Sequence, residues 1–195
     1  MRLIYGVGFN DRKYPARMID KNRPTREYDL WRSMLSRCYD KINLKDRPTY
    51  IDCSVSDDFK SYSYFYEWCQ DQIGFSRVNK INLDKDLIGC GKIYSPDNCL
   101  FLPPMVNGVL TTSKSKRGEF PIGVSLYKPT GKYRVQIERY NKKYSIGYFD
   151  NPVDAFARYK EAREAHIKDV ARKYRDVIDP RAYTALMNYT VEITD

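Results

Sequence analysis

The sequence predicts an α+β fold: a helical N-terminal region, a central ββα finger, and a C-terminal three-stranded antiparallel sheet packed on one long helix. Two observations carry this prediction. Apolar residues recur with helical spacing in the first part of the chain, and from Phe120 they alternate with polar residues along three short segments. The 195 residues are enough for one domain of ordinary size or two small ones.

Two helical stretches are expected after an irregular arm. Glycines and prolines interrupt any period over residues 1–27. From Tyr28, apolar residues at i, i+3, i+4 and i+7 predict a helix with one buried face, made of Trp31, Met34, Leu35 and Cys38. A second stretch, residues 55–73, places the following side chains on one face: Phe59, Tyr62, Phe65, Tyr66, Cys69 and Ile73. This spacing favours packing over base stacking.

Residues 81–110 predict a finger of two strands and a helix. INLDKDL reads as a strand, IGCGK as a tight loop and IYSPDNCLFL as a second extended segment. PPMVNGVL then begins a short helix, because proline is tolerated in a first helical turn. We place the helical region and the finger together at residues 28–110, followed by a basic linker at 111–119.

Residues 120–178 predict a compact sheet-and-helix module. GVSLY, YRVQIER and KYSIGYF alternate apolar and polar residues and are separated by the turns KPTG and YNK. Val135 and Ile137 are expected to point inward. Asn151 is a predicted N-cap and Pro152 a predicted first residue of a helix that ends near Tyr174. Residues 179–195 form a tail that begins with a short helix.

The charge distribution favours nucleic acid as a partner. The formal net charge is +9, and residues 111–148 carry nine basic side chains against two acidic ones. Clustered positive charge binds phosphates with release of counterions. No apolar stretch reaches the ~20 residues of a membrane span, so we expect no membrane partner. The five cysteines contain no CxxC pair, which favours buried free thiols in a soluble protein of the cytoplasm over a zinc site.

The C-terminal module resembles the DNA-binding domain of plant ethylene-response factors, which also recurs in phage and bacterial homing endonucleases. The shared pattern is carried here by Gly123-Val124, Gly131-Lys132-Tyr133, Ile146-Gly147-Tyr148-Phe149, and Ala155 with Tyr159. In that family the outward sheet face enters the major groove, and its contact positions map onto Ser125, Tyr127, Gln136, Glu138, Lys143 and Ser145. Two serines and a glutamate stand where the family usually has strong base readers, so its target sequence does not carry over.

Several residues remain suited to DNA in this module and its linker. Lysine and arginine side chains grip phosphates, and a glutamine can read an adenine edge. The DNA-binding residues that we expect are Lys116, Arg117, Tyr127, Lys128, Lys132, Arg134, Gln136 and Lys143. The alternative is a sheet that only packs on a partner protein.

The segment LDKDLIGCGKIYSPDNCLFLPPMVNGVL resembles the HNH, or His-Me finger, nuclease motif of phage homing endonucleases. The resemblance implies one Mg²⁺ or Mn²⁺ ion held by Asp84 and Asn107, with Asn98 tying the loop together. The usual general base is a histidine directly after the first ligand, and Lys85 stands there. Lys85 would serve as a base if its pKa were lowered by the site, and Asp86 is the other candidate.

The resulting expectation is a phage-type, HNH-like, metal-dependent endonuclease that binds duplex DNA and nicks or cuts it in the host-cell cytoplasm. Two alternatives stay open. The finger can be an inactive scaffold in a DNA-binding or regulatory protein, because it lacks the histidine. The chain can also be a phage protein that binds a host protein through its tyrosine-rich N-terminal half. Basic clustering favours the first two functions over the third.

Overall fold

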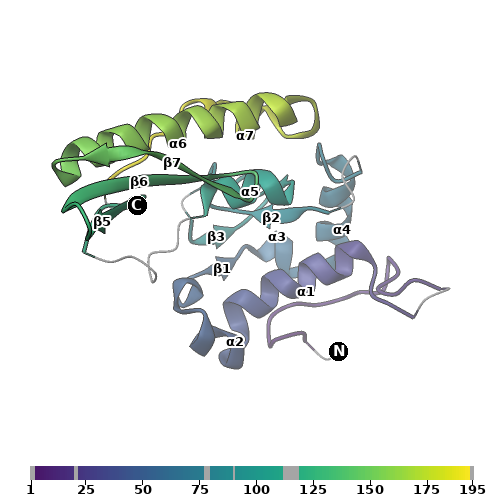
Figure 1. Ribbon diagram of the computed structural model, residues 1–195. Coiled ribbons are helices and arrows are strands. Elements are labelled where there is room, and N and C mark those ends of the chain that lie inside the picture. The colour runs from purple at the N-terminus through teal and green to yellow at the C-terminus, as the bar shows by residue number, and fades with distance from the viewer. Residues whose placement is uncertain (1–2, 20–21, 77–79, 90, 112–118, 194–195) are drawn as a thin grey trace. The chain divides into compact units, whose positions relative to one another are not determined.

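The structure of the chain, a computed structural model, has the α+β class that the sequence predicts (Figure 1). Helices dominate the N-terminal region, and a C-terminal three-stranded antiparallel sheet packs on one long helix. Across the described part of the chain, no helix is both long enough and apolar enough to pass through a membrane. The residues that the structure describes are 3–19, 22–76, 80–89, 91–111 and 119–193.

The chain divides into two compact units. The first consists of Met1–Pro103 and Asp176–Ala182, and the second of Pro104–Arg175 and Tyr183–Asp195. The first boundary therefore falls directly after the last strand of the predicted finger. Helix α7 (Pro180–Met187) crosses the last boundary.

The first unit contains the predicted N-terminal helix. Helix α1 (Arg26–Tyr39) begins after Thr25, whose side chain accepts a hydrogen bond from the N–H of Tyr28. All four residues of the predicted apolar face are buried, and Trp31 Nε1 donates to the carbonyl oxygen of Phe59 at 2.8 Å. The face predicted from spacing is thus the face that enters the core. Two short elements follow: α2 (Lys41–Asp46) and a 3-10 turn, η1 (Pro48–Tyr50).

The prediction of one helical stretch over residues 55–73 is wrong, because the chain forms two short helices separated at Ser61. The N–H of Phe9 donates to the carbonyl of Lys60, and the N–H of Tyr62 donates to the carbonyl of Phe9, each at 3.0 Å. This bridge from the N-terminal arm holds Ser61 in an extended conformation, where its side chain caps the second helix. The helices are α3 (Asp57–Lys60) and α4 (Tyr62–Asp71).

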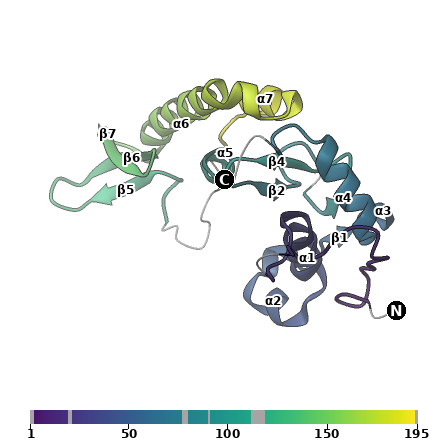
Figure 2. The ribbon, with the colours of Figure 1, turned by 90° about the vertical axis from the view of Figure 1, so that its right-hand side faces the viewer.

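Four short strands complete the first unit. The strands are β1 (Ser54–Val55), β2 (Asn82–Asp84), β3 (Ile93–Tyr94) and β4 (Leu100–Leu102). β2 pairs antiparallel with β4, so that Asp84 lies opposite Leu100 (Figure 2). β1 pairs parallel with β3. The antiparallel pair supplies the two strands of the predicted finger, and a loop leaves β2 directly after Asp84.

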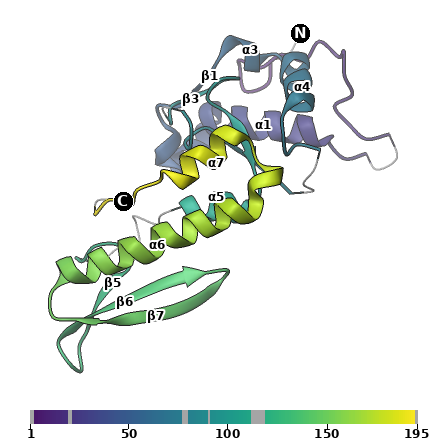
Figure 3. The same ribbon diagram turned by 90° about the horizontal axis from the view of Figure 1, so that it is seen from above.

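The second unit begins with the predicted short helix, α5 (Pro104–Leu110), and contains the three-stranded sheet with its long helix. Strands β5 (Val124–Tyr127), β6 (Lys132–Arg139) and β7 (Lys142–Phe149) pair antiparallel in that order. Helix α6 (Pro152–Tyr174) starts after the predicted N-cap Asn151, whose side chain accepts from the N–H of Asp154. It lies along one face of the sheet (Figure 3), where Val135 and Ile137 are buried as predicted.

A bulge changes which residues of β7 face away from α6. Arg134 pairs with Tyr148, whereas Gln136 pairs with Ser145, so that β7 holds one residue more than β6 over this interval. Strict alternation along β7 from Ser145 would turn Tyr148 toward α6. The bulge instead places Tyr148 opposite Arg134, on the face that α6 leaves uncovered.

Gly123, directly before β5, lies so close to α6 that we expect no larger side chain to fit at this position. Gly123 has φ +76°, and a Cβ there would lie 2.0 Å from Cδ2 of Tyr159 on α6. Gly131 has a similar φ of +68° but open space around a Cβ. We expect Gly131→Ala to lower the free energy of unfolding by about 1 kcal/mol through backbone strain alone. Gly123→Ala should lower it clearly further, because Tyr159 must move. Denaturant unfolding followed by circular dichroism measures both; equal losses would contradict the close contact.

Candidate functional site

The outer face of the sheet, defined here as the face of β5–β7 turned away from α6, carries the predicted contact positions. Cross-strand pairs fix its membership, since residues directly opposite each other in a pair share a face. These pairs are Ser125 with Arg134, Arg134 with Tyr148, Tyr127 with Lys132, Gln136 with Ser145, and Glu138 with Lys143. The structure thus brings the predicted DNA-binding and family-contact residues of all three strands onto one surface. They are Ser125, Tyr127, Lys132, Arg134, Gln136, Glu138, Lys143 and Ser145.

Three side chains form a cluster at one end of the outer face. The rings of Tyr127 and Tyr148 lie 5.2 Å apart between centroids, with an interplanar angle of 57°. The Cζ atom of Arg134 lies 5.9 Å from the Tyr127 ring centroid, within the range of a cation–π contact. The Nε of Arg134 is buried without a hydrogen-bond partner. Among the described residues, the guanidinium of Arg134 is therefore held by packing against a ring and not by a carboxylate.

The lysines of the outer face differ in their surroundings. Lys132 Nζ lies 3.0 Å from Oδ1 of Asp150, in an exposed ion pair that water and salt screen. Lys143 is exposed opposite Glu138, and Lys128 is exposed in the turn after β5. These ammonium groups are available to a polyanion. Two further predicted contacts, Lys116 and Arg117, lie outside the described residues.

The predicted metal ligand Asp84 closes a turn at the end of β2. Its Oδ1 accepts hydrogen bonds from the N–H groups of Asp86 at 3.1 Å and Leu87 at 2.9 Å. Burial raises the pKa of the Asp84 carboxyl, although these two backbone donors act in the opposite direction. Asp84 is therefore a buried turn residue whose carboxylate helps to shape the loop that follows.

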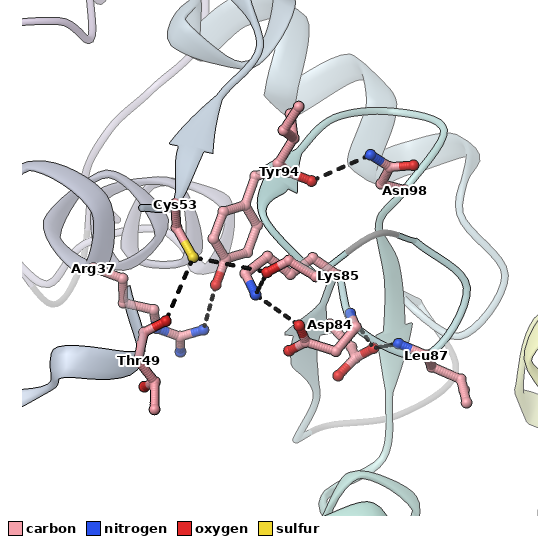
Figure 4. Close-up of polar contacts among 11 residues, drawn as sticks. Arg37, Thr49, Cys53, Asp84, Lys85, Leu87, Tyr94 and Asn98 are labelled. Carbon is pink, nitrogen blue, oxygen red and sulfur yellow. Dashed lines mark hydrogen bonds and ion pairs between the residues drawn. The ribbon is translucent and has the colours of Figure 1, made fainter. Parts of the chain in front are cut away.

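Lys85 is almost completely buried and holds the same loop from inside (Figure 4). Its Nζ donates to Oδ1 of Asp86 at 2.7 Å and to the carbonyl oxygen of Gly91 at 2.5 Å. The ammonium also lies 5.5 Å from the ring centroid of Tyr50 and 5.4 Å from that of Tyr94. One cation thus joins the start of the loop to its end and contacts two aromatic walls.

Lys85 would act as a base only if the site lowered its pKa, and its contacts act in the opposite direction. Burial does oppose the charge, but the hydrogen bond and attraction of Asp86 outweigh it and hold the pKa of Lys85 above its usual value. In this geometry Lys85 donates to Asp86 and Gly91, whereas a general base must accept a proton from water. Asp86, the other candidate, is largely exposed and accepts from Lys85.

The two remaining finger residues lie in different units. Asn98 belongs to the first, where its Nδ2 donates to the carbonyl of Ile93 at 3.4 Å and so joins the two ends of the 93–98 segment. Asn107 lies on α5 in the second unit. There Arg163 of α6 donates from Nη2 to the carbonyl of Val109 at 2.8 Å, which fastens α5 to α6. The pairing of Asn107 with Asp84 stays a prediction.

The carboxylates of the finger loop already have hydrogen-bond partners within the loop. One oxygen of Asp84 already accepts two backbone hydrogen bonds, and Asp86 is engaged by a lysine ammonium, the cation that this loop does hold. Among the described residues, no three histidine, cysteine, aspartate or glutamate side chains are grouped as metal ligands.

The buried cysteines and the single histidine have packing roles. Cys38, Cys53, Cys69 and Cys99 are free and buried. Burial raises the pKa of the Cys38 and Cys99 thiols to about 12, so neither is a thiolate nucleophile at neutral pH. His166 is buried on α6 with its ring 5.1 Å from that of Tyr140, and burial lowers its pKa.

Sequence reasoning missed Tyr148 as an outer-face residue and Tyr50 as a wall of the Lys85 site. The sequence signal that could have identified Tyr148 is the glycine directly before it in the predicted strand, because glycine within a strand often marks a bulge. Comparisons with protein-family models, curated proteins and solved structures gave no match for this chain.

The contacts of Lys85 predict that it stabilises the loop and does little else. Lys85→Met should lower the free energy of unfolding by about 1–3 kcal/mol, because the carbonyl of Gly91 loses a charged donor. Lys92→Met removes only an exposed ion pair with Asp52, in which nitrogen and oxygen lie 3.6 Å apart. This variant should change the free energy of unfolding by less than about 0.5 kcal/mol. Denaturant titration compares the two variants, and similar losses would contradict a specific role for Lys85.

The same interaction predicts a sign for the pH dependence. The folded-state pKa of Lys85 is raised above its ordinary 10.5, so its contribution is complete below that pH and disappears as pH rises through the folded-state pKa. The stability difference between wild type and Lys85→Met should therefore shrink in strongly alkaline solution.

Proposed function

We propose that this protein binds duplex DNA through the outer face of its sheet. The observation that carries the proposal is the position of Arg134. Its guanidinium lies on the face that α6 does not cover, held by Tyr127, with no carboxylate of the described residues to neutralise it. An arginine positioned in this way is a pre-oriented donor for phosphate oxygens.

The neighbouring side chains support a phosphate-binding role. Lys128 is exposed in the turn after β5 and Lys143 is exposed opposite Glu138, and Lys132 needs to leave only a screened ion pair to join them. Phosphate contacts position a protein on DNA but carry no direct sequence information. Gln136 is the outer-face residue best suited to read an adenine edge. The face is thus better equipped to hold DNA than to select a long sequence.

The finger supports this function as a scaffold and not as a hydrolytic centre. In the HNH family that this segment resembles, the residue after the first ligand usually takes a proton from water. Lys85 occupies that position as a charged donor bound to Gly91 and Asp86. The metal-dependent endonuclease with Mg²⁺ or Mn²⁺ therefore remains the alternative, and a nicking assay decides between the two functions.

Removing the proposed phosphate contacts should weaken binding in a salt-dependent manner. For the double variant Arg134→Ala, Lys143→Ala, a plot of log K against log salt concentration should become shallower by about 2, one unit for each lost phosphate contact. The matched control is Arg158→Ala, Arg172→Ala, which removes the same charge from exposed ion pairs on α6. Fluorescence anisotropy with a labelled duplex measures both. Equal weakening by the two double variants would remove the outer face from the proposal.

The scaffold role predicts that supercoiled plasmid stays intact in Mg²⁺ or Mn²⁺ while gel shifts show that the protein binds it. The informative variants are Asp84→Asn, which keeps an oxygen to accept from the turn N–H groups, and Asn107→Ala. Metal-dependent nicking by wild type that both variants abolish would restore the endonuclease function and overturn the scaffold.

A further inference from the structure

We propose that Tyr148, supported by Tyr127 and Arg134, is a stacking surface for an unpaired nucleobase. The inference rests on the proposed DNA binding and names the form of DNA that the outer face prefers: a duplex interrupted by an unpaired base. Tyr148 comes from β7, Tyr127 from β5 and Arg134 from the strand between them. All three strands of the sheet thus contribute to one cluster.

The cluster leaves one aromatic surface open. Arg134 contacts the ring of Tyr127, and Tyr127 in turn lies 5.2 Å from Tyr148. Tyr148 is the terminal member and remains 48% exposed. Its partners limit how far its ring can rotate, so that little side-chain freedom is left to lose when a base stacks on it. The guanidinium of Arg134 lies over the neighbouring Tyr127 ring and supplies the cluster with a positive charge for the backbone phosphate of a stacked nucleotide.

An intact duplex cannot use such a surface well. In the grooves of B-DNA, bases present their edges, and their faces are covered by neighbouring base pairs. Aromatic rings stack on base faces, which become accessible only where a base is unpaired or displaced. The short side chains Ser125 and Ser145 at other outer-face positions offer little reach toward groove edges. The aromatic cluster therefore suits a displaced base better than a regular groove.

A purely structural role does not explain the exposure of Tyr148. The sheet is held to α6 by residues of its other face, among them Val135 and Ile137, which are buried. Tyr144 provides a comparison within the same strand. It is 49% exposed but lies opposite Ile137 and lines a groove with Arg139 and residues of α6. Two tyrosines of equal exposure on β7 thus serve opposite faces.

The test compares the affinity of the full-length protein for two labelled duplexes, of which one carries a single unpaired adenine. Wild type should bind the bulged duplex about tenfold more tightly. Tyr148→Phe should keep that preference because it keeps the ring, and Tyr148→Ser should lose it. Tyr144→Ser, the matched control from the other face, should keep it. Circular dichroism confirms that each variant is folded.

Replacing the unpaired adenine with 2-aminopurine tests stacking directly, because its fluorescence falls when the base stacks. Wild type and Tyr148→Phe should quench it and Tyr148→Ser should not. Equal affinity of wild type for both duplexes, or unchanged quenching by Tyr148→Ser, overturns the stacking surface. In that case, if binding to both duplexes still depends on salt, the proposed DNA-binding function is retained. If neither duplex shows salt-dependent binding, the proposed function fails together with the inference.

Discussion

Helix α6 covers one face of a three-stranded sheet, and this single packing arrangement determines what the second unit can do. Val135 and Ile137 enter the contact with α6, so the residues that alternate with them along β6 must point the other way. Among the described residues of this unit, no second helix packs along that opposite face. Its side chains must therefore be compatible with water, and here they are also basic and aromatic. The exposure of these side chains follows from how the core of the unit is built.

Local sequence signals predict the elements of this arrangement well. Alternation with period two marks the three strands, and Asn151 followed by Pro152 marks the start of α6, because both signals depend on neighbours close in sequence. Features that depend on distant contacts were not predictable. The predicted helix is interrupted at Ser61 because Phe9 forms a backbone bridge to that residue. Tyr148 faces outward because the β6–β7 pairing contains a bulge. Neither partner can be read from a local period.

In the candidate site, too, the residue types were predictable from the sequence, whereas the contacts of those residues were not. The sequence indicates that an acid, a lysine and a second acid follow one another at the end of a strand, and a family resemblance assigns roles to them. It cannot indicate that the lysine ammonium reaches Gly91, because that contact depends on the path of the intervening loop. The direction of the Lys85 pKa shift depends on the same path. Burial of the ammonium acts to lower that pKa, and the hydrogen bond to Asp86 acts to raise it.

A lysine ammonium can replace part of what a metal ion does in a finger of this kind. It carries positive charge into a buried loop, binds a carbonyl oxygen and attracts a carboxylate, and these interactions are enough to hold the loop closed. It cannot supply the strong polarisation of a bound water that makes hydroxide available near neutral pH. Loop geometry and hydrolytic chemistry are therefore separable. Asp84 and Lys85 shape the loop after β2 through hydrogen bonds within the chain, and a loop held in this way is compatible with the proposed DNA binding.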